Sequence, residues 1–281
     1  INKLATETKN EEAAWYRSNF LEKGDNIFDI IWPRPSSLGV PPKNPSKHFR
    51  TIDWWVMRTD FMNPNKVIVA GKAGKNDDPH HGHLDIGHFV VYWNKEYFIR
   101  DLGRSGYDEK YFDEARFEYP EAASSGHNTI LVNGEQQISA KYYKQPYDYS
   151  IGGEVLSFQS SDKVDYVLMD PTKAYPNKEL KKWRRSVVLK KPEVTLVLDE
   201  IKSTSNAEIK VRFHPGVEVE IYEKLVMLEG KNGKMALIPI LNQKFEINQG
   251  RHTSQMVNGT EKFKWIDYFD IEVNSRKEIT N

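Results

Sequence analysis

The chain has no cysteine among its 281 residues. No disulfide can therefore hold its fold, and no thiolate can bind a metal or attack a substrate. The formal net charge is zero, which gives no electrostatic reason to expect nucleic acid or an anionic membrane surface as a partner. No apolar run approaches the roughly 20 residues that a membrane-spanning helix needs, and the N-terminus lacks a signal-peptide pattern. We therefore expect neither nucleic acid nor a membrane among the partners.

Motifs of several enzyme classes are also missing. The zinc-protease pattern HExxH, the GxSxG nucleophile elbow and the phosphate-binding loop do not occur. A cupin-type metal site needs an HxH pair followed closely by a glutamate, and residues 84–93 contain none. What the chain has in abundance is aromatic residues, 14 Tyr, 13 Phe and 7 Trp, which are typical of half-buried strands and also suit sugar-binding clefts.

The N-terminal part of the chain differs from the rest. Residues 10–24 predict a short helix with Trp15 on its apolar face and Gly24 as its C-terminal stop. Five prolines between residues 33 and 45 then exclude regular helix or central strand. We assign residues 1–49 to a helical segment followed by a proline-rich linker.

From about Arg50 the pattern changes from helical to alternating. Short runs rich in β-branched and aromatic residues, separated by Gly, Asn and Pro, predict strands. The pair Asn94 and Lys95 predicts a tight hairpin turn. No βαβ alternation or fixed-period repeat is present, so we expect an all-β, antiparallel β-sandwich over residues 50–281. The predicted strands span residues 66–74, 87–94, 96–103, 128–134, 151–161, 164–170, 183–191, 194–201, 207–215, 217–224, 225–230 and 234–241.

Four of the eight histidines fall in the ten-residue segment HHGHLDIGHF, which starts at His80. In an extended segment, His81, His83 and Asp85 would share one face. Imidazole nitrogen and carboxylate oxygen are ligands that zinc and similar metals accept. We expect His80 to be solvated in a turn and His88 to point to the opposite face from His83. A polar patch of surface histidines is the alternative interpretation.

A second group of polar residues strengthens the metal-site hypothesis. Asp101 ends one predicted strand and His127 opens another. A metal site on a sandwich draws ligands from neighbouring strands in this way. Strand parity would place Asp85 beside His83, either as a ligand or as the acceptor of a hydrogen bond from a ligand's second ring nitrogen.

These segments resemble the heparinase II/III-like polysaccharide lyases. The resemblance is carried by HGHLDIGHFVVYWNKEYFIRDLG, by SSGHNTILVNGEQQ and by DPTKAYPNKELKKWRRSVVLKKPEVTLVLDEI. It covers roughly residues 50–201, and its most specific part is the succession of HxHxDxGxF, DxG and HNT elements. The remainder of the chain is similar only in its β character.

The resemblance implies roles for five residues. His83, Asp101 and His127 would bind zinc or a similar divalent ion of mainly structural role. His81 would face the active site as the candidate catalytic residue, where it neutralises the substrate carboxylate or positions a proton. Tyr119 is a candidate substrate contact, with ordinary packing beside Phe117 as the alternative.

The resemblance also implies a reaction, β-elimination at a uronic acid of an acidic polysaccharide of the heparin or heparan sulfate kind. The enzyme neutralises the carboxylate, a base removes the C5 proton, and an acid protonates the leaving oxygen. Lys141, Lys144, Arg184 and Arg185 are candidates for sulfate contacts, with solvated surface charges as the alternative. Export of family members by bacteria that degrade glycosaminoglycans predicts a periplasmic or secreted location.

Family members carry an (α/α) toroid before the sandwich, and this toroid supplies a catalytic tyrosine and an asparagine or histidine. Only the helix around Trp15 and the proline-rich linker match such a toroid, and the chain starts at Ile1 rather than at a methionine. We therefore expect an upstream toroid domain in the full-length protein and little lyase activity from residues 1–281 alone. A non-catalytic, metal-stabilised carbohydrate-binding or interaction module is the alternative function.

Overall fold

A computed structural model describes residues 1–21, 31–32, 36–76, 81–104, 109–112, 114–140, 146–176, 178–203, 207–257 and 261–274. The chain divides into two compact units, Ile1–Pro45 and Ser46–Asn281. The first is helical and the second is built from strands. No helix in the described part of the chain is long and apolar enough to cross a membrane.

The first unit contains helices α1 (Asn2–Glu7) and α2 (Glu11–Phe20). Helix α2 begins at Asn10, whose side chain accepts a hydrogen bond from the backbone N–H of Ala13 at 2.7 Å. This N-cap satisfies one of the donors that the first turn leaves open. The predicted helix is thus confirmed over its central part, and Gly24 lies outside the described residues. The pattern does not predict α1, which is too short to show a period.

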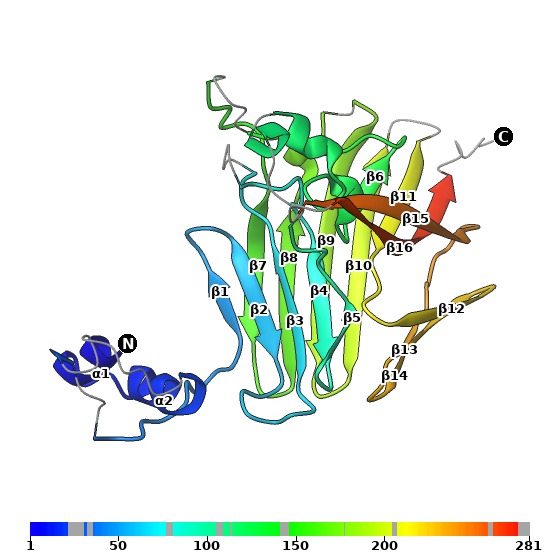
Figure 1. The fold of residues 1–281 in the computed structure, drawn as a ribbon. Coiled ribbons are helices and arrows are strands. Elements are labelled where there is room, and N and C mark those ends of the chain that lie inside the picture. The colour runs from blue at the N-terminus through cyan, green and yellow to red at the C-terminus, as the bar shows by residue number, and fades with distance from the viewer. Residues whose placement is uncertain are drawn as a thin grey trace. The chain divides into compact units, whose positions relative to one another are not determined.

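The second unit contains four antiparallel sheets within the described residues (Figure 1). In spatial order, the first sheet consists of β1 (Lys47–Phe49), β2 (Trp54–Arg58), β3 (Val67–Lys72), β4 (Phe89–Trp93) and β5 (Glu96–Ile99). The second consists of β10 (Val194–Ser203), β9 (Leu180–Lys190), β8 (Val164–Asp170) and β7 (Glu154–Ser160). The third consists of β15 (Glu246–Val257), β16 (Glu261–Asn274), β11 (Glu208–Phe213) and β6 (Ile130–Val132). The fourth consists of β12 (Glu218–Tyr222), β13 (Leu225–Glu229) and β14 (Lys234–Leu237).

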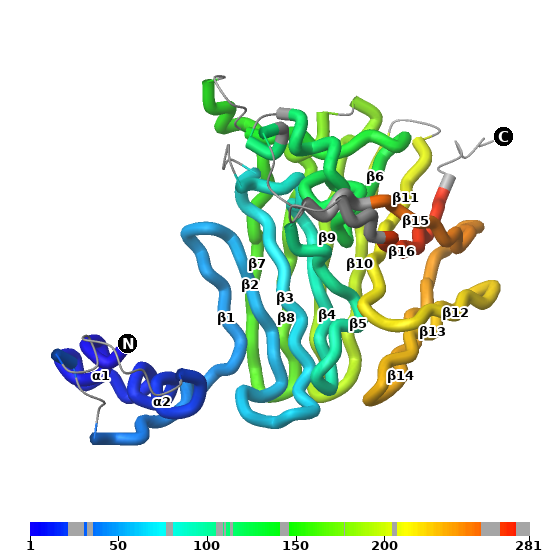
Figure 2. The backbone as a smooth tube through the Cα atoms, in the orientation of Figure 1, coloured from blue at the N-terminus to red at the C-terminus, as the bar shows by residue number. Residues whose placement is uncertain are grey.

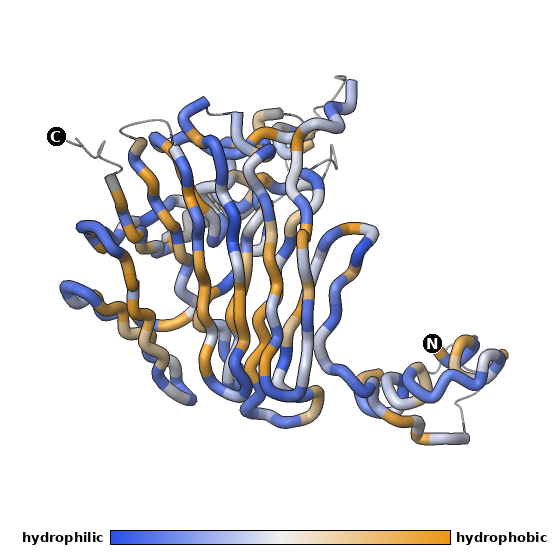
Figure 3. The backbone as a smooth tube through the Cα atoms, turned by 180° about the vertical axis from the view of Figure 1, so that it is seen from behind, coloured by the Kyte–Doolittle hydropathy of each residue, from blue (hydrophilic) through white to orange (hydrophobic). Residues whose placement is uncertain are grey.

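The first two sheets lie face to face, as the views from the front and the back show (Figures 2 and 3). Alternate residues point inward and form one apolar core, in which Met57 and Val69 of the first sheet meet Val167 and Val187 of the second. Burial of these side chains drives the pairing of the layers. The predicted antiparallel sandwich is confirmed. Short 3₁₀ turns connect the strands at Glu109–Phe112, Glu114–Glu118, Ser124–Gly126 and Thr172–Ala174.

Candidate metal centre

The histidine-rich segment does not form a strand. Residues 81–88 form turns that lead into β4, which begins at Phe89. The backbone reverses at Gly87, whose φ is +81°, a conformation that glycine adopts without steric cost. The N–H of His88 donates to the carbonyl of Asp85 at 3.0 Å. The expected strand parity is therefore wrong, and with it the expectation that His88 faces away from His83.

His127 is the centre of a cluster of histidines and aspartates. Its ring lies 5.3 Å from that of His83 and 5.1 Å from that of His88, centroid to centroid. Potential ligand atoms of His83, Asp85 and His127 all lie within 4.8 Å of one another, and so do those of His88, Asp101 and His127. The structure thus gathers all three predicted ligands around His127, distributed over two overlapping groups.

Asn128 ties the segments of this cluster together. Its side-chain amide donates to the carbonyls of Phe89 at 2.8 Å and Arg100 at 2.9 Å, and its side-chain oxygen accepts from the N–H of His214 at 2.7 Å. Its own backbone N–H donates to Nδ1 of His88 at 2.9 Å. Asn128 therefore fixes the start of β4, the end of β5 and the start of β6 relative to one another.

The bond from Asn128 assigns the tautomer of His88. Since Nδ1 accepts this hydrogen bond, the proton of the neutral ring is on Nε2, which faces Oδ2 of Asp101 at 3.2 Å. A protonated Nε2 cannot bind a metal. His88 is therefore suited to orient the carboxylate of Asp101, in the way that hydrogen-bonding partners commonly orient metal ligands.

In the described part of the chain, His127 lacks a hydrogen bond of the kind that Asn128 makes to the ring of His88. It is fully buried, and Nδ1 lies 3.2 Å from Oδ2 of Asp101 without hydrogen-bond geometry. Within the described residues neither ring nitrogen of His127 has a hydrogen-bond partner. Buried polar atoms in native proteins are normally satisfied, and one without a partner calls for an explanation such as a bound ion. The residues present therefore fit a metal site.

The charges of the cluster are set by burial and by the pairing of Asp101. Burial, followed by the neighbouring His127, lowers the pKa of His83 to about 4. Burial opposes ionisation of Asp101, but the adjacent His127 and His88 outweigh it and hold the pKa of Asp101 well below its usual range. Burial likewise opposes charge on His127, and Asp101 outweighs it, so the pKa of His127 is raised. Without an ion the group thus offers a carboxylate and an uncharged His83, and His127 would release its proton when a divalent ion binds.

Asp85 has a strong partner of its own. Its Oδ1 accepts from Nζ of Lys72 at 2.7 Å. Burial opposes its ionisation, but Lys72 outweighs this and lowers the pKa of Asp85. Asp85 therefore carries a negative charge beside His83, already neutralised in part by Lys72.

His81 lines a cleft of about 1030 Å³ together with His83, His88 and Asp101. Tyr119 is placed differently. It packs against Tyr111, with ring centroids 6.1 Å apart, and it is not among the described residues that line this cleft.

Tyr111 links Tyr119 to the cluster, since its hydroxyl lies 3.3 Å from Nε2 of His83. The sequence gives no signal for Tyr111, which lies in a segment without a strand or helix pattern. His80, Lys141 and Lys144 lie outside the described residues.

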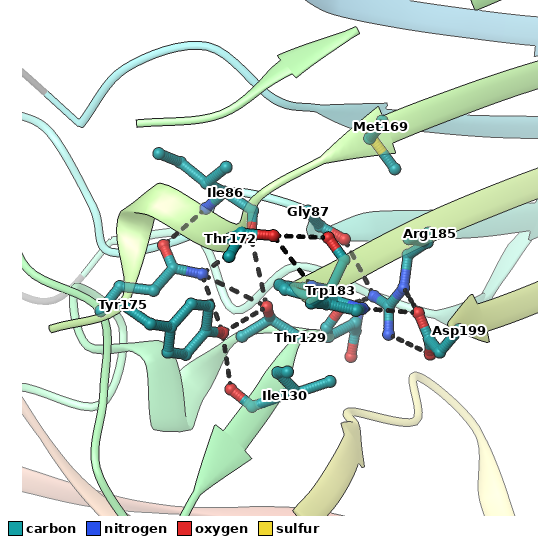
Figure 4. Close-up of polar contacts among 12 residues, drawn as sticks. Ile86, Gly87, Thr129, Ile130, Met169, Thr172, Tyr175, Trp183, Arg185 and Asp199 are labelled. Carbon is teal, nitrogen blue, oxygen red and sulfur yellow. Dashed lines mark hydrogen bonds and ion pairs between the residues drawn. The ribbon is translucent and has the colours of Figure 1, made fainter. Parts of the chain in front are cut away.

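Figure 4 shows a buried polar network that includes Arg185 and Asp199. Arg185 is fully buried in β9. Its Nε and Nη2 atoms each bind a carboxylate oxygen of Asp199 at 2.8 Å, and its Nη1 donates to the carbonyls of Gly87 at 2.9 Å and Asn128 at 2.8 Å. These carbonyls belong to residues directly next to two of the clustered histidines, so one guanidinium fixes both loops. The hypothesis that Arg185 contacts sulfates or is a solvated charge is wrong.

The same network holds the histidine-rich segment from a second side (Figure 4). The side chain of Gln137 accepts from the N–H of Ile86 at 2.9 Å and donates to its carbonyl at 2.7 Å. Tyr175 donates from its hydroxyl to the carbonyl of Ile130 at 2.7 Å, and burial raises the pKa of Tyr175 to about 12. Tyr175 therefore remains protonated and acts as a structural donor.

Comparison with known proteins agrees with this architecture. Residues 41–279 match the family described as "Heparinase II/III-like, C-terminal". No curated protein matches the chain. The heparan sulfate lyase HepC from Pedobacter heparinus has a similar fold, with a TM-score of 0.69 and 16% identity over 95% of this chain and 39% of that chain. Heparinase III is similar with a TM-score of 0.67 and 18% identity over 85% of this chain and 36% of that chain.

This chain thus spans less than two fifths of the length of either solved enzyme. Identities this low show a shared fold, whereas the family match extends over most of the sequence, from residue 41 to residue 279. The match includes the histidine cluster, its cleft and both sheets of the sandwich. The chain therefore belongs to the heparinase II/III-like family, of which it contains the C-terminal β domain.

Proposed function

We propose that the chain is the C-terminal domain of a polysaccharide lyase that cleaves uronic acid-containing glycans, of the heparin or heparan sulfate kind, by β-elimination. The observation that carries the proposal is a buried histidine–aspartate cluster that opens, through His81 and His83, into a cleft. A saccharide can enter such a cleft, and the buried groups behind it can fix the positions of the side chains that meet it.

His81 is the residue of this chain that we assign to the chemistry. In β-elimination a base takes the C5 proton, the electron pair forms the C4=C5 double bond, and the C4–O bond breaks as an acid protonates the leaving oxygen. Neutralising the C6 carboxylate makes the C5 proton more acidic. An imidazole at the cleft surface can contribute to carboxylate neutralisation or to proton transfer.

We further propose that His83, Asp101 and His127 hold a zinc or similar divalent ion. When bound, the ion would cross-link the loops that line the cleft. Nε2 of His88, 3.2 Å from Oδ2 of Asp101, would orient that carboxylate, while Lys72 pairs with Asp85. The ion is mainly structural in this proposal, and His81 meets the substrate.

Family membership also supports two wider proposals. The first is a helical toroid domain upstream of this chain in the full-length protein, consistent with the fraction of the two solved lyases that the chain spans. The second is a periplasmic or secreted location, where an enzyme of this type would meet polysaccharide.

The isolated chain is expected to produce no unsaturated uronate from heparan sulfate, because half of the cleft and its catalytic tyrosine would come from the toroid. A longer chain that includes the upstream region is expected to be active, and to lose activity in the variant His81→Ala. The measurement is the ultraviolet absorbance of the unsaturated product.

Brisk turnover by residues 1–281 alone would contradict the division of the cleft between two domains. Full activity of His81→Ala in the longer chain would contradict the role of His81. If the longer chain binds glycan but never cleaves it, the domain is a non-catalytic, metal-stabilised carbohydrate-binding module instead.

A further inference from the structure

The outer face of the first sheet carries two exposed aromatic side chains next to each other. Trp54 pairs with Phe49 across β1 and β2, and with Lys72 across β2 and β3. Residues directly opposite in antiparallel strands lie on the same face with closely spaced side chains. Trp54 is 51% exposed and Phe49 is 49% exposed, whereas the next residue, Trp55, is 2% exposed in the core.

This row lies in the same cleft as the histidine cluster. Phe49, Trp54 and Lys72 line the cleft together with His81 and His83. Nζ of Lys72 lies 5.8 Å from the centre of the Trp54 ring, within the range of a cation–π contact. The aromatic pair and the histidines therefore belong to one continuous surface.

The carboxylates of the cleft are already paired. Asp53 contacts Nε2 of His48 at 2.9 Å, Asp85 contacts Lys72 at 2.7 Å, and Asp101 lies 3.2 Å from the ring nitrogens of two histidines. Each carboxylate of the cleft thus lies beside a lysine or a histidine.

Two cations of the cleft have no direct ion pair within the described residues. No carboxylate in that part of the chain contacts Arg58 or Lys75, which both line the cleft, and Asp148 interacts with Lys75 only at longer range. Nζ of Lys75 donates only to the backbone carbonyls of Tyr149 and Ile151. The guanidinium of Arg58, two alternate positions along β2 from Trp54, lies over the ring of Phe61 at 5.1 Å. The cations at these two positions can each meet an anionic group of a ligand.

We propose that Phe49 and Trp54 form a saccharide-binding platform on which sugar units of an acidic glycan stack beside His81. The flat C–H face of a pyranose packs on an aromatic ring, and two adjacent rings suit two neighbouring sugar units. Arg58 and Lys75 would then meet carboxylate or sulfate groups. The acidic nature of the glycan rests on the proposed function, whereas the stacking role rests on the exposed aromatic pair.

The test compares two exposed tryptophans with matched surroundings. Trp265 is 62% exposed on β16, and the guanidinium of Arg251 lies 5.8 Å from its ring centre, as Lys72 does from Trp54. Binding of a heparin-derived tetrasaccharide and of neutral cellotetraose is measured by isothermal titration calorimetry for the 281-residue chain, for Trp54→Ala and for Trp265→Ala. We expect the acidic tetrasaccharide to bind the original chain, with Kd about tenfold higher in Trp54→Ala, or about 1.4 kcal/mol, and unchanged in Trp265→Ala.

Equal Kd values for the original chain and Trp54→Ala, or equal losses in both variants, would overturn the platform. So would the absence of binding to either saccharide, which would leave the aromatic pair as a surface for contact with protein. The outcomes also separate this proposal from the lyase function. Trp54-dependent binding that favours cellotetraose keeps the platform and contradicts a uronate substrate. Uronate elimination by the longer chain with an unchanged Kd in Trp54→Ala keeps the lyase and removes the platform.

Discussion

Replacing Arg185 with methionine is expected to lower the free energy of unfolding by about 3–5 kcal/mol, as for other buried ion pairs that lose one partner. The variant leaves Asp199, whose side chain is 13% exposed, without its bidentate partner and removes the donor to the carbonyls of Gly87 and Asn128. Urea unfolding followed by circular dichroism measures the loss.

Arg184→Met is the matched control. Arg184 is the neighbouring residue on the same strand, its side chain is 41% exposed, and it pairs with Asp170 at 3.1 Å. An exposed pair contributes less than about 1 kcal/mol, so the control should be nearly as stable as the original chain. Equal losses of unfolding free energy in both variants would contradict the proposed role of Arg185 in fixing the two loops. Adding Asp199→Leu to Arg185→Met should recover part of the loss, because the half-buried carboxylate that lost its guanidinium partner is then removed.

Replacing His127 with alanine is expected to lower the affinity for zinc by more than about 100-fold, whereas His88→Gln should lower it by about 10- to 100-fold, the usual effect of losing a residue that orients a ligand. The physical reason is which ring nitrogens are free of a hydrogen bond and can bind the metal. Both ring nitrogens of His127 lack a hydrogen-bond partner within the described residues, while Nδ1 of His88 accepts from Asn128. Competition with a chromophoric chelator measures both affinities.

His48→Ala is the control for this series, because His48 pairs with Asp53 outside the cluster and should leave zinc affinity unchanged. Circular dichroism of each variant checks that the fold is retained. Zinc affinity that survives in His127→Ala but is abolished in His88→Gln would reverse the roles assigned to the two histidines.

Strands with strict alternation were predictable from the sequence. The segment VDYVLMD alternates between exposed and buried positions, and β8 has the bounds that the pattern predicts, 164–170. Strand β15 was missed, because EINQGRHTSQMV is mostly polar and shows no alternation. Its partner β16, EKFKWIDYFDIEVN, was missed although it carries the aromatic and β-branched residues that are typical of strands. Strand β2 was missed because outward Trp54 and inward Trp55 are both aromatic.

The candidate site follows from the family resemblance as a set of residues, but its geometry does not. The resemblance implies His83, Asp101 and His127, and the structure places His83 and Asp101 in separate groups that share His127. The place of His88 did not follow, because strand parity fails where the backbone turns at Gly87. The hydrogen bond from the backbone N–H of Asn128 to His88 could not be predicted from the sequence either.

For Arg185, by contrast, the alternation of residues along β9 already indicated a buried side chain. It has the same parity along β9 as Trp183, Val187 and Leu189, all of which are buried. An arginine at a core-facing position needs a buried partner. Asp199, which lies directly opposite Arg185 on β10, is the acidic residue that could have been predicted as this partner.

The most direct test of the account is the metal content of the purified chain and of His83→Ala, measured by elemental mass spectrometry. The account predicts close to one zinc, or another divalent ion, per chain and its loss in the variant, because His83 is one of the few uncharged nitrogen ligands that the cluster offers. Absence of metal from both proteins, even after zinc is added back, would contradict the metal centre and reduce the cluster to a buried polar network.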